Sequence, residues 1–328
     1  MVQIDPRKLP AARKAAMPEF VSPQLATLVR EPPAGDEWLH ELKVDGYRMI
    51  CHLNRGAVRF WSRNGKDWTE KFSNLIKALK AFPATTAILD GEVVIEDKQG
   101  RSSFQKLQQS MKGAPAAFVF HIFDVIYLDG CNLMKTSLRE RKAVLKKLLA
   151  SAKAKGPLRY SDHVEGNGAR FFKQACEYGI EGIVSKLADS PYESKRNQNW
   201  LKTKCRKRQE FVVVGYTQSK KGFPGFGSLI LGVYDKGKLI YTGRVGTGFS
   251  IKQRLELQKK LDRISQSATP FAVKPKDPGL REARWARPQL VAEVEFTEWT
   301  DEGSIRHPSF QGLREDKKAS EVVREEPV

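Results

Sequence analysis

The spacing of apolar residues between Trp38 and Lys204 switches repeatedly between strand-like and helix-like patterns. Six short runs alternate apolar and polar residues or form compact apolar blocks, as strands do: "WLHELKV", "YRMICHL", "AVRFWS", "AILDGEVVIE", "AAFVFHIFDVIYL" and "EGIVSK". Three longer stretches have helical spacing: "EKFSNLIKALKAF", "LRERKAVLKKLLASA" and "GARFFKQACEYG". The pattern predicts a mixed α/β domain built largely on antiparallel sheet.

After the basic run "KTKCRKRQE" at residues 202–210, the pattern becomes that of a small β-rich domain. Three strand-like runs, "EFVVVGYTQ", "GSLILGVYD" and "KLIYTGRVG", are separated by turns that contain glycine and lysine. An amphipathic helix, "IKQRLELQKKLDRI", and another strand, "PQLVAEVEFTEW", follow. Several short strands with one helix fit a small barrel such as the OB-fold. We place the boundary near residue 208, which predicts domains at residues 1–208 and 209–328.

The net charge of the chain indicates which class of partner it binds. The chain of 328 residues carries 57 lysines and arginines against 38 aspartates and glutamates, a net charge of +19. A protein this basic usually meets a polyanion, and nucleic acid is the first candidate. A basic solvated surface and a membrane-surface protein are the alternatives. The hydrophobic content of 40% and aromatic content of 9% exclude a disordered chain.

The distribution of apolar residues and cysteines indicates a cytosolic protein. Apolar runs stay shorter than the roughly 18 residues that a membrane-spanning helix needs. The N-terminal segment lacks the apolar core of a signal peptide. The four cysteines are far apart and form no CxxC pair: Cys51, Cys131, Cys176 and Cys205. We therefore expect reduced, structural thiols, without a disulfide framework or a zinc site.

Charged residues cluster on one predicted face of several strands. Because side chains alternate along a strand, Glu41, Lys43 and Asp45 share a face. Leu42 and Val44 lie on the opposite face. The same rule groups two further sets: Asp90 with Glu92, and Trp200 with Lys202 and Lys204. A solvated face of antiparallel sheet explains any one strand. Neighbouring glycines, which let a ligand or backbone come close, favour a site instead: Gly46, Gly91 and Gly182.

The residue types limit the chemistry to phosphate groups handled by lysine. The pattern around "NGKD", residues 64–67, has Phe60 where a P-loop needs its first glycine. The HExxH and GxSxG motifs are absent from the sequence, and the five histidines form no close pair. Lysines and arginines suit phosphates, and the carboxylates of Glu92 and Glu181 suit a hard divalent cation. Any phosphate chemistry in this chain is therefore expected to centre on a lysine.

The stretch "KVDGYR", residues 43–48, resembles the KxDGxR signature of covalent nucleotidyltransferases, which comprise DNA ligases, RNA ligases and mRNA capping enzymes. Six further motifs follow in the order of that superfamily: "SRNG" (62–65), "LDGEVV" (89–94), "FDVIYLDG" (123–130), "EGIVSK" (181–186), "WLKTK" (200–204) and "RHPSFQGLREDK" (306–317). Seven ordered motifs make the resemblance specific. The last three are similar to those of ATP-dependent bacterial DNA ligases, especially the ligase module of the end-joining ligase D type.

The resemblance implies an α+β chain. A nucleotidyltransferase (adenylation) domain, ATP-grasp-like with mixed antiparallel sheets and helices, is followed by a C-terminal OB-fold β-barrel. The stretch before Lys43 is too short for the helical DNA-encircling domain of the large eukaryotic and archaeal ligases. The polymerase and nuclease modules that often accompany ligase D are expected to be absent too. We therefore expect a monomeric, minimal ligase, either free-standing or an excised module.

The resemblance also implies a three-step phosphoryl transfer that starts at Lys43. Lys43 attacks the α-phosphorus of ATP and expels pyrophosphate, AMP passes to the 5′-phosphate of a nick, and the 3′-OH then displaces AMP. The first step needs a neutral amine, although a free lysine has a pKa of about 10.4. Mg²⁺, Lys202 and Lys204 are the expected sources of a field that disfavours the charged form. Asp45 and Glu41 act the other way, so we expect them to contact ligand or metal.

Further roles come from the same resemblance. On the nucleotide, Arg48 and Glu92 are expected to hold the ribose, Phe123 the adenine face, Glu41 the adenine edge, and Lys202 and Lys204 the α-phosphate. Glu92 and Glu181 are expected to bind the metal, and Arg63 the nick phosphate. Four residues are expected to meet the pyrophosphate: Arg306, Arg314, Asp316 and Lys317. The last four lie in the OB domain, which must close over ATP and later admit DNA by moving about "CRKRQE". By residue type alone, Phe123 is a core aromatic, Glu181 a capping or paired carboxylate, and Lys186 a surface lysine.

The implied ligands are ATP and Mg²⁺ or Mn²⁺, and the implied substrate is nicked or broken double-stranded DNA. Ku and a repair polymerase are further candidate partners. The basic joint and "SKKGF", residues 219–223, are candidate contacts to backbone phosphates, and such contacts are salt-sensitive. An enzyme of this kind acts in the bacterial cytoplasm, at the nucleoid, in DNA repair or end joining.

Two alternatives stay open on the sequence. The first is an RNA ligase or a capping guanylyltransferase, which uses the same covalent chemistry. The second is a non-catalytic nucleic-acid-binding protein with an OB-fold and a degenerate enzyme domain. The intact "KVDGYR" argues against the second, because a decayed enzyme has little reason to retain a lysine so placed.

Overall fold

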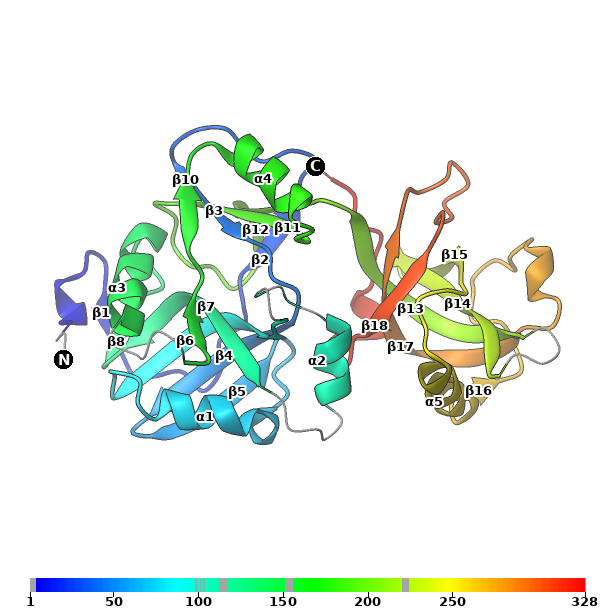
Figure 1. Cartoon of the computed structure of the whole chain (residues 1–328), viewed down its shortest axis with the longest axis horizontal. Coiled ribbons are helices and arrows are strands. Elements are labelled where there is room, and N and C mark those ends of the chain that lie inside the picture. Colours follow the sequence, from blue (N-terminus) through cyan, green and yellow to red (C-terminus); the bar gives the residue numbers. More distant parts are fainter. Residues whose placement is uncertain are drawn as a thin grey trace. The chain divides into compact units, whose positions relative to one another are not determined.

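The computed structural model describes residues 4–97, 100, 102, 104–111, 117–150, 156–219 and 224–327. Within these residues the chain forms two compact units, which divide between Cys205 and Arg206. The first unit contains two β-sheets flanked by helices, and the second contains one sheet with a helix (Figure 1). No helix in the described part of the chain is long and apolar enough to cross a membrane. Apart from Ser219, the predicted contact "SKKGF" lies outside the described residues.

The large sheet of the first unit is antiparallel along its main path, β1-β8-β7-β6-β4-β5. A short strand, β9, adds to β7 in parallel. The strands are β1 (Arg13–Lys14), β4 (Tyr47–Asn54), β5 (Ala57–Ser62), β6 (Thr86–Ile95), β7 (Phe118–Leu128), β8 (Cys131–Asn132) and β9 (Leu158–Tyr160). The four long ones, β4 to β7, confirm the runs predicted from alternation, whereas the shorter ones were not predicted.

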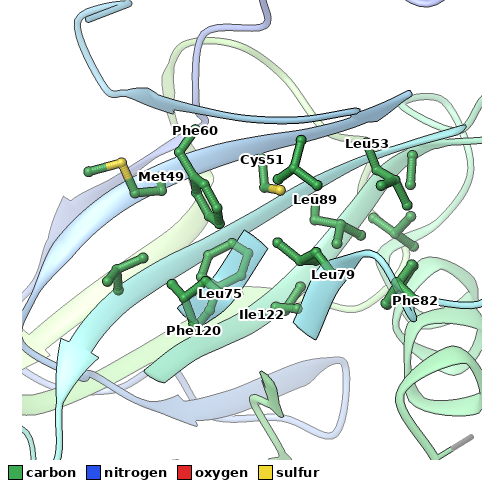
Figure 2. Close-up of a cluster of buried hydrophobic side chains, with 14 of the residues drawn as sticks. Met49, Cys51, Leu53, Phe60, Leu75, Leu79, Phe82, Leu89, Phe120 and Ile122 are labelled. Carbon is green, nitrogen blue, oxygen red and sulfur yellow. The ribbon is translucent and has the colours of Figure 1, made fainter. Parts of the chain in front are cut away.

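Alternation along β4 builds the main core of the first unit. Met49, Cys51 and Leu53 point to one face of the sheet and are at most 2% exposed. Leu75 and Leu79 of α1 cover that face, and Figure 2 shows these side chains packed together. The helical segments of the unit are η1 (Pro6–Lys8), η2 (Thr69–Phe72), α1 (Ser73–Leu79), α2 (Phe104–Ser110), α3 (Leu138–Ala150) and α4 (Gly168–Glu177). Segments η2 with α1, α3 and α4 confirm the three predicted helical stretches.

The small sheet of the first unit has the order β10-β3-β11-β12-β2. Its strands are β2 (Leu25–Leu28), β3 (Trp38–Leu42), β10 (His163–Glu165), β11 (Gly182–Leu187) and β12 (Arg196–Lys204). Strands β12 and β2 are parallel, which departs from the predicted antiparallel sheet. Strand β2 comes from the irregular N-terminal segment and is too short to show a period. In Figure 1 this sheet lies above the large sheet, with α4 on its outer side.

A second cluster of apolar side chains joins the two sheets. Ile50, Ile88 and Phe123 come from the large sheet, and Trp200 comes from the small sheet. Tyr192, in the loop before β12, belongs to the same cluster. The predicted motif strands from both sheets therefore meet at this contact.

The second unit is a single antiparallel sheet with the order β15-β14-β13-β17-β16, and β18 pairs with β17. Its elements are β13 (Lys207–Gln218), β14 (Phe226–Asp235), β15 (Lys238–Val245), α5 (Ile251–Asp262), β16 (Ser265–Gln266), η3 (Pro278–Leu280), β17 (Arg284–Phe296), β18 (Ser309–Leu313) and η4 (Ala319–Glu321). Helix α5 begins with a reciprocal capping box between Ser250 and Gln253. These elements confirm the predicted strands and the one predicted amphipathic helix.

The prediction of reduced cysteines is wrong for one pair. Cys176 of α4 and Cys205 form a disulfide, with their Cα atoms 5.3 Å apart and a sequence separation of 29. Cys51 and Cys131 are free and buried. The Cys205 N–H donates to the Glu181 carbonyl at 2.9 Å, so the disulfide lies beside a motif residue. Sequence spacing could not reveal this pair, because α4 and the end of β12 come together only in the folded sheet.

Candidate active site

Lys43 sits immediately after the last residue of β3, where it meets the start of β11. Its backbone N–H donates to the Gly182 carbonyl at 2.9 Å, and its Nζ donates to Glu181 Oε2 at 2.6 Å. The Lys43 side chain is 25% exposed, and that of Glu181 is 8% exposed. A Cβ on Gly182 would lie 2.1 Å from the Thr203 carbonyl, so only glycine lets β11 approach β12 here. The predicted motifs "KVDGYR" and "EGIVSK" are therefore brought together.

The ionisation of Lys43 is governed by its neighbouring carboxylates. Burial acts to lower the pKa of the Lys43 ammonium. The carboxylate of Glu181 outweighs burial, with help from Asp45 and Glu92, and the pKa is raised. A field from nearby cations was expected to have the opposite effect. In this state the three carboxylates dominate, and Lys43 is an ammonium at neutral pH.

Glu41 is held in a buried cluster of charges that the motifs alone do not show. Its Oε1 accepts from Lys142 Nζ at 2.6 Å, and its Oε2 accepts from Lys186 Nζ at 2.9 Å. The Ser161 hydroxyl also donates to Oε2, at 3.0 Å. Lys142, Lys186 and Ser161 are partners of Glu41 that the sequence did not reveal, and its predicted place at the adenine edge stays a prediction.

The view of Lys186 as a surface lysine is wrong. Its side chain is 3% exposed, and Nζ lies 4.1 Å from the Phe123 ring centroid and 4.3 Å from that of Trp200. Burial lowers its pKa to about 8, and the neighbouring ammonium of Lys142 acts in the same direction. Two aromatic faces and the carboxylate of Glu41 compensate the buried charge. The Phe123 ring is thus both a core aromatic and one wall of this charged cluster.

The sequence analysis did not identify Lys142 as a buried residue of the site, although the spacing of apolar residues in helix α3 indicates its burial. Buried positions of α3 form a stripe that includes Leu138, Val144 and Leu145, and Arg141 and Lys142 lie within that stripe. A charged residue at a position where helical spacing requires an apolar one indicates a buried partner. For Arg141 that partner is Asp124, with Nε donating to Oδ1 at 2.8 Å and both side chains fully buried.

Arg48 lies in β4 of the large sheet, where hydrogen bonds fix its side chain. Its Nε and one Nη donate to the two carboxylate oxygens of Asp90 at 2.5 and 2.6 Å, and Asp90 is fully buried. The Tyr192 hydroxyl donates to the same carboxylate at 2.6 Å. The guanidinium of Arg48 stacks 4.5 Å from the Phe123 ring centroid. Across β4 and β6, Arg48 is directly opposite Glu92, so this carboxylate also belongs to the site.

Glu41 and Leu42 lie on opposite faces of β3, as predicted, but the charged face is the buried one. Register places Glu41, Val184 and Lys202 side by side across β3, β11 and β12. In β3 the burial is inverted: Glu41 is 2% exposed, whereas Leu42 is 41% exposed. Strand β3 also ends at Leu42, so the alternation does not extend to the residues that follow. The period correctly separated the two faces, but it could not tell which of them meets the other sheet.

The residues assigned to a metal offer oxygen ligands, but they do not form a complete coordination shell. Glu181, immediately before β11, and Glu92, in β6 of the large sheet, both act on Lys43. Among the described residues, no group of three or more His, Cys, Asp or Glu side chains could hold a metal ion. Mg²⁺ typically uses one or two carboxylates and completes its shell with water and substrate phosphates. The two glutamates fit that requirement.

The residues predicted to contact the nick phosphate and the pyrophosphate lie away from Lys43 in the sequence of elements, in the turn after β5 and in the second unit. Arg63 is half-buried in the turn after β5. In the second unit, Arg314 donates to Asp316 at 2.9 and 2.8 Å and to Glu293 at 2.9 Å. Lys317 pairs with Glu210 at 2.9 Å. The predicted pyrophosphate cations are therefore engaged in ion pairs within their own unit.

Two family models match the chain in the order of its two units. The model described as "ATP dependent DNA ligase domain" matches residues 23–204, and "ATP dependent DNA ligase C terminal region" matches residues 223–317. The multifunctional non-homologous end joining protein LigD of Pseudomonas aeruginosa is 40% identical, over 96% of this chain and 38% of that protein. The LigD of Mycobacterium tuberculosis is 36% identical, over 88% of this chain and 38% of that protein. The chain thus spans about 38% of the length of these relatives.

Solved structures agree with the sequence matches. A mycobacterial DNA ligase D complexed with ATP and MES has a TM-score of 0.70 and 35% identity, covering 93% of this chain and 98% of that chain. The ligase domain of Mycobacterium tuberculosis LigD has a TM-score of 0.52 and 37% identity, with the same coverage of 93% and 98%. The expected fold, a nucleotidyltransferase domain followed by an OB-fold, is confirmed. The chain belongs to the ATP-dependent DNA ligase family.

Proposed function

We propose that this chain is an ATP-dependent DNA ligase that seals 3′-OH/5′-phosphate breaks through a lysyl-AMP on Lys43 and a DNA-adenylate. The observation that carries the proposal is the placement of Lys43. Its amine is partly exposed and is held at 2.6 Å by the carboxylate of Glu181. Two more carboxylates, Asp45 and Glu92, act on the same amine. A lysine so placed, in a member of this family, supports covalent nucleotidyl transfer.

Glu181 controls the protonation of the nucleophile in this mechanism. While its carboxylate holds the Lys43 ammonium, the lone pair of Nζ is occupied by a proton. Once that carboxylate is engaged elsewhere, Lys43 loses its nearest counter-charge, and its pKa falls. Mg²⁺ or Mn²⁺ held by Glu92 and Glu181 would supply positive charge to the phosphates and offset the carboxylates. Lys43 then releases one proton to solvent and donates its lone pair to the α-phosphorus, and the bond between that phosphorus and pyrophosphate breaks.

The other residues position the substrate. Arg48 is held by Asp90, which fixes its guanidinium for the ribose alongside Glu92. We assign the adenine to Phe123, with Glu41 at its edge, and the α-phosphate to Lys202 and Lys204 of β12. Asp45 lies next to the nucleophile, where it contacts ligand. Arg63 is assigned to the nick phosphate, and Arg314 and Lys317 to the departing pyrophosphate.

The biological setting is part of the same proposal. LigD relatives are named for non-homologous end joining, which supports a role in DNA repair by end joining. The substrate is then nicked or broken duplex DNA in the bacterial cytoplasm, at the nucleoid, with Ku and a repair polymerase as candidate partners. RNA ligation and guanylyl transfer are not favoured, because the matching family models are those of DNA ligases.

The direct test is to incubate the full chain with labelled ATP or labelled GTP and Mg²⁺, and to follow label on the protein by denaturing gel and intact mass. We expect one AMP per chain from ATP, no adduct from GTP, and loss of AMP on adding pyrophosphate. Nicked duplex DNA should then be sealed, and the same nick in duplex RNA should be sealed far more slowly. A protein that forms no adduct with ATP, or seals RNA better, would contradict the proposal.

Glu181→Gln should lower the pKa of Lys43. The amide keeps the shape of the side chain but removes the main cause of the raised pKa, so at a given pH more of the amine is neutral. Reductive methylation with peptide mapping, without ATP or metal, reports the neutral fraction. We expect Lys43 to be labelled at least about tenfold faster in Glu181→Gln at pH 8, which corresponds to one pKa unit. Exposed Lys77 is the internal control, and equal labelling of Lys43 in both proteins would remove Glu181 from this role.

Lys142→Met should weaken both the fold and ATP binding. It removes one of the two ammonium groups on the buried carboxylate of Glu41. We expect the free energy of unfolding in urea to fall by about 2 kcal/mol and the KM for ATP to rise more than kcat falls. Lys146→Met, one turn along α3 at a 60% exposed side chain, is the matched control and should change little. Equal effects of the two variants would show that Lys142 has no special role.

A further inference from the structure

An open cavity of about 590 Å³ lies in the first unit, outside the site described above. Its walls come from the N-terminal arm (residues 10–15), the loop after β8 and the loop before β12. Arg13 and Lys14 line it from the arm, Lys135 from the second wall, and Lys195 from the third. None of the roles proposed so far uses these four cations. We call this feature the arm cavity.

The arm that carries two of these cations is fixed by backbone contacts. Strand β1 of the arm pairs with β8, and Ala15 N–H donates to the Gly130 carbonyl at 3.0 Å. The Tyr127 hydroxyl donates to the Ala15 carbonyl at 2.9 Å, and the Thr136 hydroxyl donates to the Pro10 carbonyl at 2.9 Å. These contacts do not involve the side chains of Arg13 and Lys14. The side chains are therefore held at the cavity by the fold and remain available to a ligand.

The charges around the arm cavity are not balanced within the protein. Arg13, Lys14 and Lys135 are exposed, and in the part of the chain that the structure describes they form no salt bridge. Glu193 is the one carboxylate among the described lining residues, and it already pairs with Lys195 at 3.2 Å. Several cations gathered around a concave surface concentrate a positive potential there. Such a surface favours a ligand with more than one negative charge.

The arm cavity shares a wall with the candidate active site. Tyr192 lines the cavity, and its hydroxyl donates to Asp90, which in turn holds Arg48. The Tyr192 ring also packs at right angles to Trp200, with 5.9 Å between centroids. A ligand in the cavity would therefore contact the outer side of Tyr192, whose hydroxyl supports Asp90 of the candidate active site. None of the described residues that line the cavity is assigned to ATP.

We propose that the arm cavity binds phosphodiester groups of the DNA duplex beside the nick, through Arg13, Lys14 and Lys135. The proposal rests on the proposed ligase function and adds a phosphate-binding surface to it. DNA is favoured over the triphosphate of ATP because the cations are spread over three chain segments around an open hollow, as a repeating backbone requires. The contact is electrostatic and independent of base sequence, so it should appear in the salt dependence of binding.

The test compares two triple variants of the full chain. Arg13→Gln/Lys14→Gln/Lys135→Gln neutralises the arm cavity, and Lys71→Gln/Lys77→Gln/Lys80→Gln removes three exposed charges on η2 and around α1, away from the cavity. Fluorescence anisotropy measures binding of a labelled nicked duplex between about 50 and 200 mM salt. Each lost phosphate contact lowers the slope of log K against log salt by about 0.9. We expect the slope to fall by about 2 to 3 in the cavity variant and by less than about 1 in the control.

Adenylation of Lys43 by ATP is measured on the same proteins, and circular dichroism checks that both variants fold. We expect both variants to adenylate at the wild-type rate. Equal salt slopes in the two variants would overturn the proposal. Loss of adenylation in the cavity variant, with unchanged DNA binding, would also overturn it and point to the phosphates of ATP. Failure of wild-type protein to adenylate would instead contradict the ligase proposal, and the DNA-binding comparison would still stand.

Discussion

Lys43→Arg is expected to abolish the covalent AMP adduct, with a fall of at least about a thousandfold in the rate of adenylation. Arginine stays protonated at any pH that the protein tolerates, so it offers no free amine to the α-phosphorus. It still carries a positive charge that can pair with Glu181, and the backbone bond to Gly182 is unaffected, so the fold should persist. Peptide mapping after incubation with ATP and Mg²⁺ locates the adduct.

The same variant separates the first step from the last. A nick that already carries the 5′-adenylate needs no lysyl-AMP, so Lys43→Arg should still seal it. Lys77→Arg, on the exposed face of α1, is the control and should behave as wild type in both assays. Uptake of AMP by Lys43→Arg at the wild-type rate, or an adduct mapped to another lysine, would refute the assignment of the nucleophile.

Arg314→Ala should destabilise the second unit by about 3–5 kcal/mol, because it breaks a buried ion-pair network. Arg314 holds Asp316 through two hydrogen bonds and Glu293 through a third, and both carboxylates are almost fully buried. Arg208 remains near Glu293 at 3.0 Å, and the charge of Lys317 still acts on Asp316, but the two hydrogen bonds from Arg314 to Asp316 are lost. Urea unfolding followed by tryptophan fluorescence, which includes Trp285 and Trp299 of this unit, measures the loss.

The pH dependence of that loss has a definite sign. Burial acts to raise the pKa of the Asp316 carboxyl, but Arg314 outweighs it and the pKa is lowered. A carboxyl with a lowered pKa stabilises the fold above its unfolded value of about 3.9, and this contribution is lost as the pH falls through the lowered value. The difference between wild type and Arg314→Ala should therefore be full at pH 7 and shrink below about pH 4. A difference independent of pH would exclude the ion pair as its cause.

Lys317→Ala is the cleaner probe of the pyrophosphate role. Its partner Glu210 is 21% exposed and the pair is partly solvated, so its loss should cost less than about 1 kcal/mol. If Lys317 meets the pyrophosphate, adenylation should slow while sealing of a pre-adenylated nick stays normal, because pyrophosphate leaves only in the first step. Equal loss of both activities would assign Lys317 to the structure of the unit instead.

Much of this protein was determined by local sequence. Alternation identified the long strands β4 to β7 and β13 to β15, and helical spacing identified α3, α4 and α5. Those predictions succeeded because each element buries a face of its own, and the period of the apolar residues records that face. The seven ordered motifs indicated the family, because the chemistry requires particular residue types in a particular order, and the role of Lys43 as nucleophile stays a prediction.

The tertiary structure decided which charges meet, and therefore how each one behaves. Lys186 and Lys142 lie far from Glu41 in sequence, yet they form one buried cluster with it. The period of a strand separates two faces without telling which one meets another sheet, so Glu41 proved buried and Leu42 exposed. The raised pKa of Lys43 likewise depends on Glu181, which only the pairing of β3 with β11 brings to its amine. Burial and charge pairing depend on distances in space between elements, and no pattern within one element contains those distances.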